Sequence, residues 1–145
     1  MDEWKIIDLP YISLLKLNDD EESTQEEGVT EVHHFIKEKL RIGDVQGTAN
    51  NFCNLAIYFQ RNRRYGRALS YFRKDLYLSE LTGNKRDIAT TLGNLSGLYI
   101  ELRQFKKAKD LIWKLKKLSI ELDDNYLKDL NDHHYKVLNN KTRQA

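Results

Sequence analysis

The sequence contains an internal repeat of 40 residues, and this repeat constrains the fold more than any other feature. Residues 43–82 and 83–122 align without gaps. The two units share nine identical positions: Gly43/Gly83, Ala49/Ala89, Asn54/Asn94, Leu55/Leu95, Arg63/Arg103, Ala68/Ala108, Lys74/Lys114, Leu78/Leu118 and Ser79/Ser119. We therefore expect two copies of one structural unit, stacked against each other.

Each unit carries two apolar patterns with helical spacing. In the first unit, apolar residues recur every three or four positions before and after the polar segment 60–64, at Ala49, Phe52, Leu55 and Phe59 and then at Tyr65, Ala68, Phe72 and Leu76. This spacing predicts two antiparallel helices joined by a short turn. Gly43 and Gly83 stand where a helix end favours a left-handed residue. Ala68 and Ala108 are small, which predicts that two helices cross closely there.

The regions outside the repeat predict flanking helices. Residues 1–28 form an acidic segment that we expect to be partly disordered, although Leu9, Ile12 and Leu15 fit a remnant first helix. Residues 29–42 predict a degenerate half-repeat helix, whose apolar face is Val29, Val32, Ile36 and Leu40. Residues 123–145 predict a C-terminal capping helix and tail, whose apolar face holds Tyr126 or Leu127, then Leu130, His134 and Leu138.

Composition places the chain among all-α proteins without a membrane span. It is 40% hydrophobic and 32% charged, with one proline, and its apolar runs are too short to cross a bilayer. The lone Cys53 excludes an internal disulfide, which fits an intracellular protein, cytoplasmic or nuclear. Charge is uneven: residues 1–31 hold ten acids and two bases, a net of −8, whereas residues 32–145 hold 22 bases and 12 acids, a net of +10. The imbalance suggests an acidic partner.

The residue pattern of the two units resembles the tetratricopeptide repeat (TPR). The match lies in small-x-x-apolar-x-x-Leu in the first helix, and in aromatic-x-x-Ala in the second, across residues 43–122. The usual period of that family is 34 residues, and the longer period here is similar to the repeats of spindle-orientation adaptors of the LGN/Pins type and of tonsoku-type scaffolds. The resemblance implies a short, right-handed α-solenoid of antiparallel helix pairs, with a capping helix on each side.

The resemblance also implies a concave groove lined by the first helices. In the first unit the groove residues would be Asn50, Cys53, Asn54, Ile57, Gln60 and Arg61, and in the second Thr90, Gly93, Asn94, Gly97, Ile100 and Glu101. In this family an asparagine at the position of Asn54 and Asn94 often binds the main chain of a peptide, because a carboxamide donates and accepts together. The alternative is an asparagine that bonds within its own repeat. Gly93 and Gly97 would let a ligand approach the helix closely.

Basic residues form a second candidate surface. They crowd the first inter-helix turn and the start of the second unit's second helix, at Arg63, Arg64, Arg67, Lys106, Lys107 and Lys109. A solvated outer face is the simplest interpretation, and an acidic partner or a nucleic-acid backbone is the alternative. Nucleic acid is the less favoured partner, because aromatic residues interleave with these bases only at core positions.

The sequence holds no motif for catalysis, a phosphate or a metal. The histidines occur as adjacent pairs, which point about 100° apart on a helix and do not form a metal pair. We therefore expect no enzyme activity, no cofactor and no metal. The favoured function is a protein-binding adaptor or scaffold that holds a peptide in the groove. The alternatives are a subunit that self-associates through exposed repeat edges and a nucleic-acid-associated factor that uses the basic face.

Overall fold

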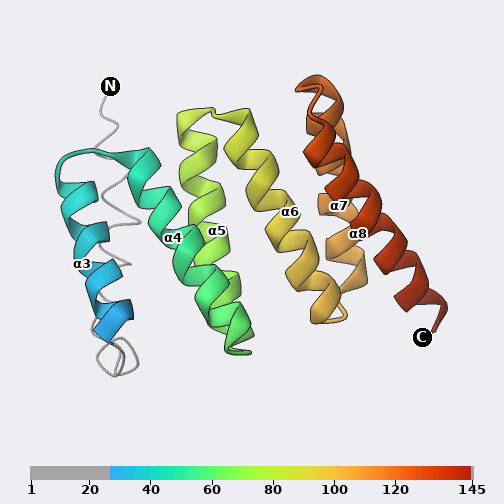
Figure 1. The fold of residues 1–145 in the computed structure, drawn as a ribbon, viewed down its shortest axis with the longest axis horizontal. Coiled ribbons are helices and arrows are strands. Elements are labelled where there is room, and N and C mark those ends of the chain that lie inside the picture. The colour runs from blue at the N-terminus through green and yellow to red at the C-terminus, as the bar shows by residue number, and fades with distance from the viewer. Residues whose placement is uncertain (1–26, 145) are drawn as a thin grey trace.

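The structure is a computed structural model that describes residues 27–144, and within that range helices joined by short turns are the only regular secondary structure (Figure 1). The six helices are α3 (Glu27–Arg41), α4 (Val45–Arg61), α5 (Tyr65–Thr82), α6 (Lys85–Glu101), α7 (Phe105–Glu121) and α8 (Asn125–Arg143). The all-α prediction is confirmed for this range. The expected acidic linker and remnant helix before residue 27 lie outside the described residues, as do the side chains of Val29 and Val32.

The helices pack as neighbouring pairs along one direction, which is the arrangement of an α-solenoid. Helices α4, α6 and α8 lie side by side in one layer, and α5 and α7 lie behind them (Figure 1). Each helix packs on the next helix in the chain, and α6 also packs on α8. The predicted helix pairs α4–α5 and α6–α7 therefore form, and α3 and α8 flank them.

The 40-residue period extends to the helix starts. Asp44, Asn84 and Asp124 each precede a helix, and each side chain accepts a hydrogen bond from the backbone N–H three residues later, at 2.8, 3.2 and 3.0 Å. Such capping satisfies one of the N–H groups that a helix start leaves unpaired. Because these caps recur at the same offset, α8 begins where the first helix of a third unit would begin. The expected capping helix therefore takes the position that the first helix of a third repeat would have.

The core runs through both repeats. Ala68 and Ala108 are fully buried, as the predicted close helix crossing requires. Gly43 and Gly83 have φ of 77° and 69°, so both adopt the left-handed conformation that the sequence predicts. Ile36 and Leu40 of α3 are buried in the same core cluster as Phe52 of α4 and Phe72 of α5.

Candidate groove on the first helices

The predicted groove residues form matching stripes on α4 and α6. On α4 the stripe is Asn50, Asn54, Ile57 and Arg61, and on α6 it is Thr90, Asn94, Gly97 and Glu101. Within each stripe the residues follow one another at three or four positions, so they share a helix face. The stripes are surface-facing, since every member is either exposed or half-buried.

Two contacts tie α4 to α6 along this surface. Gln60 Nε2 donates a 2.8 Å hydrogen bond to Glu101 Oε1, and Asn94 Nδ2 lies 3.7 Å from Cys53 Sγ. Both contacts join residues 41 positions apart, which means that the two helices run parallel, one repeat apart. The structure therefore places Gln60, Glu101 and Asn94 on one surface. Cys53, the residue before Asn54 in the chain, lies beside Asn94 on it.

The polar side chains on this surface differ in how many hydrogen-bond partners they have. Asn50 accepts a 3.1 Å hydrogen bond from Gln46, and the Thr90 hydroxyl donates to the Arg86 carbonyl at 2.9 Å. Asn94 makes only the long contact to sulfur, which is a weak acceptor. Asn54 is exposed, and its carboxamide bonds to no other described residue. The two asparagines thus keep most of their hydrogen-bonding capacity.

Helix α8 packs on α6 beside the two stripes, and it explains the glycines of α6. A Cβ on Gly93 would lie 2.7 Å from Leu130 Cδ2, and one on Gly97 would lie 3.3 Å from His134 Cε1. The glycines therefore let α8 approach α6 closely. Desolvation lowers the pKa of His134, and a hydrogen bond to the Gly93 backbone opposes that shift.

Two residues that were expected in the groove lie elsewhere. Ile100 is only 4% exposed and belongs to the hydrophobic core, so its assignment to the groove was wrong. Gly93 is buried beneath Leu130 and does not face an open surface, so that assignment was wrong as well. In both cases neighbouring helices cover the face that the repeat alignment left open. Cys53 is half-buried, and burial raises the pKa of its thiol to about 12, so the thiol is protonated at neutral pH.

The candidate basic residues lie in or just after the inter-helix turn of each unit, and Arg67 and Lys107 occupy the same repeat position. Arg63 and Arg64 are in the α4–α5 turn, and Arg67 begins α5; Lys106, Lys107 and Lys109 begin α7. The two inter-helix turns lie at the same edge of the molecule (Figure 1). The Arg67 guanidinium lies 5.8 Å from the centre of the Phe59 ring, and Lys107 Nζ lies 5.7 Å from that of Tyr99. Two of the six bases thus contact an aromatic ring of their own repeat.

A buried polar cluster between the repeats was missed by sequence reasoning. The Asp75 carboxylate accepts hydrogen bonds from the hydroxyls of Thr91 at 2.8 Å and Ser79 at 3.2 Å. Burial raises the pKa of Asp75 to about 6, and the two hydroxyls oppose this shift. The repeat alignment could have indicated this cluster, because Asp75 occupies the position of the apolar Leu115 in the other unit. Its partner Thr91 is on the next helix, which spacing alone does not reveal.

Within residues 27–144, no cluster of three or more potential ligands is arranged to hold a metal ion. In the same range, every helix is too short or too polar to cross a membrane. Comparison with known proteins adds no assignment: no family model, curated protein or solved structure matches the chain.

Proposed function

We propose that the chain is a TPR-like module that binds a peptide or an extended partner segment in the groove on α4 and α6. The observation that carries the proposal is the repeated pair Asn54 and Asn94. One carboxamide has no hydrogen bond to another described residue, and the other has only a 3.7 Å contact to sulfur. A carboxamide on each of two parallel helices suits the main chain of an extended peptide, which offers donors and acceptors alternately.

The charged residues near the two asparagines favour a partner segment that carries acidic groups. Arg61 is exposed at the end of the α4 stripe, whereas Glu101 on α6 is engaged by Gln60. The Arg61 guanidinium has no ion-pair partner among residues 27–144, so it favours a carboxylate on the partner, which agrees with the basic excess of residues 32–145. In this proposal the module acts as an adaptor or scaffold component and performs no chemistry on its partner.

The experiment is affinity purification with the full chain and two matched double variants. Asn54→Ala/Asn94→Ala removes both carboxamides of the groove, and Asn125→Ala/Asn140→Ala removes two exposed carboxamides on α8. We expect the first variant to lose its partners and the second to retain them, as measured by quantitative mass spectrometry. Circular dichroism checks that both variants keep their helix content. Equal partner recovery by the two variants would contradict the proposal.

A further inference from the structure

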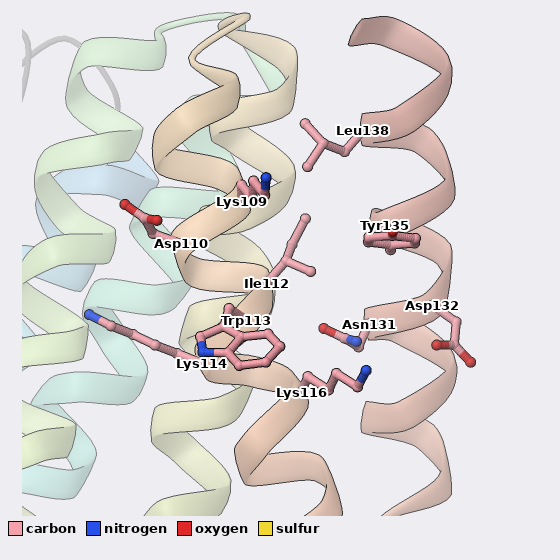
Figure 2. Close-up of a pocket in the computed structure, with 10 residues that line it drawn as sticks. All are labelled: Lys109, Asp110, Ile112, Trp113, Lys114, Lys116, Asn131, Asp132, Tyr135 and Leu138. Atoms are coloured by element: carbon pink, nitrogen blue, oxygen red, sulfur yellow. The ribbon is translucent and has the colours of Figure 1, made fainter. Parts of the chain in front are cut away.

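A groove lies between α7 and α8, on residues outside the stripes of α4 and α6. It has a volume of about 730 Å³. Figure 2 shows Ile112 and Trp113 projecting from α7, opposite Asn131, Tyr135 and Leu138 on α8. Trp113 and Tyr135 are 59% and 55% exposed, so two large aromatic side chains present apolar surface here.

The repeat shows what fills the corresponding groove one unit earlier. Tyr135 corresponds to Leu95, which is only 2% exposed, and Asp132 corresponds to the buried Leu92. Leu95 belongs to the same core cluster as Ala108 and Ile112 of α7. Leu92 likewise clusters with Leu115 of α7. A second helix of a repeat therefore covers this position on α6, whereas no described helix covers it on α8.

Asn131 gives independent support for a ligand at this place. Its side chain is only 5% exposed, and its Oδ1 is buried without a hydrogen-bond partner among the described residues. In Figure 2 the side chain points from α8 towards α7, into the groove. A buried carbonyl oxygen without a donor is unfavourable. An occupant with an N–H or O–H group would satisfy the oxygen once the Asn131 side chain turns towards it, because the oxygen is closed to solvent in this conformation.

The charge on the groove defines the occupant further. Lys109, Lys114 and Lys116 line it, against Asp110 and Asp132. Helix α7 as a whole carries six lysines and only two acids. Because basic residues outnumber acidic ones on α7, a second α7 placed against this groove would add charge of the same sign, which disfavours a dimer through the groove.

We propose that the α7–α8 groove binds an amphipathic helix of a partner protein, in the position that a second helix of a repeat would take. Its aliphatic face packs on Trp113, Tyr135 and Ile112, its acidic flank faces Lys109 and Lys116, and a polar side chain donates to Asn131. A helix suits this place because α7 occupies the corresponding one in the preceding unit.

The probe is a synthetic 17-residue peptide with the sequence Phe105–Glu121 of the chain itself, in which all six lysines are replaced by glutamate. The peptide keeps the apolar pattern that fills the preceding groove and reverses the charge of its flank. The comparison peptide keeps the lysines. We expect saturable binding of the acidic peptide to the full chain by isothermal titration calorimetry, at least about tenfold tighter than the lysine peptide. Equal binding of the two peptides would overturn the proposal.

Variants of the full chain locate the binding. Trp113→Ala and Tyr135→Ala are each expected to weaken the acidic peptide by about tenfold or more, as aromatic anchors at interfaces do. Tyr126→Ala removes an exposed tyrosine of α8 that does not line the groove, and it should leave the affinity unchanged. Asn54→Ala/Asn94→Ala should also leave it unchanged, which separates this site from the first groove. The proposal fails if the two groove variants bind like the wild type.

Two other occupants give distinct outcomes. If the chain's own acidic N-terminal segment fills the groove, then Asp19→Asn/Asp20→Asn/Glu21→Gln/Glu22→Gln should tighten peptide binding about tenfold by removing a competitor. If a second copy fills it, light scattering should show a dimer that Trp113→Ala dissociates. Either result would overturn a partner helix as the occupant.

Discussion

The Thr91 hydroxyl donates a 2.8 Å hydrogen bond to the Asp75 carboxylate, and this bond joins α5 of the first repeat to α6 of the second. Ser79, one turn after Asp75, donates a second bond at 3.2 Å. Two neutral hydroxyls do not supply a countercharge, so the ionised carboxylate is poorly compensated in its buried position. We therefore expect the contact between the repeats to respond to pH.

Asp75→Asn should stabilise the protein at neutral pH. The pKa of Asp75 is about 6 in the folded chain, above the ordinary value of 3.8. The protonated acid thus favours the folded state, and this contribution is full below pH 3.8 and is lost as the pH rises through about 6. Because the amide is never charged, we expect the variant to gain roughly 1–3 kcal/mol of unfolding free energy at pH 7.

The measurement is urea unfolding followed by circular dichroism, for both proteins at several pH values between 4 and 7. The difference in unfolding free energy between the variant and the wild type should shrink towards acidic pH. Comparing the two proteins separates the effect of Asp75 from that of His33, which both contain. Burial lowers the pKa of His33 to about 4, so its neutral form favours the folded state and its contribution to stability changes with pH in the opposite direction. A variant that is less stable than the wild type at pH 7 would show that the charged carboxylate is needed.

Gly93→Ala should be less favourable than Gly66→Ala. Gly93 lies in the interior of α6 and Gly66 in the first turn of α5, and alanine is preferred over glycine at helix positions by up to about 1 kcal/mol. A Cβ on Gly66 meets no atom within 4 Å, so this variant should realise most of that gain. A Cβ on Gly93 would meet Leu130 Cδ2 at 2.7 Å, so the Leu130 side chain must shift within the α6–α8 contact. Urea unfolding should therefore place Gly93→Ala at least about 1 kcal/mol below Gly66→Ala. An equal gain for both variants would mean that α8 does not press on Gly93.

The sequence was sufficient for the helix pairs because their determinants are local or periodic. Apolar spacing, the glycines at the helix ends and the matching alanines predicted α4 to α7, and the structure has helices at those places. The choice between Tyr126 and Leu127 on α8 needed the structure: Leu127 is buried, whereas Tyr126 is 70% exposed. Both residues fit a helical face, and only packing on α6 and α7 selects one of them.

The candidate sites were harder to predict, because they depend on which helix covers which face. The alignment placed Ile100 and Gly93 in the groove, but it did not show that the core and α8 cover them. The α7–α8 groove was not predicted either, since Asn131 and Trp113 have no counterpart of the same type one repeat earlier. Contacts between helices far apart in the sequence decide both cases.

Arg63→Gly should stabilise the α4–α5 turn. Arg63 has φ of 59°, a left-handed conformation that costs a residue with a Cβ about 1–2 kcal/mol. Glycine avoids this cost but loses more conformational entropy on folding, so we expect a net gain of about 0.5–1 kcal/mol. The converse change, Gly83→Ala at φ 69°, should be destabilising. Thermal unfolding of the two variants measures both effects, and a loss of stability in Arg63→Gly would show that its side chain holds the turn.

Lys107→Ala should cost stability although the lysine is on the surface. Its Nζ lies 5.7 Å from the centre of the Tyr99 ring, and Arg67 has the same relation to Phe59 one repeat earlier. A cation held over a ring at an exposed site contributes about 0.5–1 kcal/mol, which the alanine variant should lose. Lys106→Ala is the matched control, because Lys106 is the exposed neighbour and has no ring contact among the described residues. Urea unfolding should show a loss for Lys107→Ala and none for Lys106→Ala. If both variants match the wild type, Lys107 has no structural role and belongs with the bases available to an acidic partner.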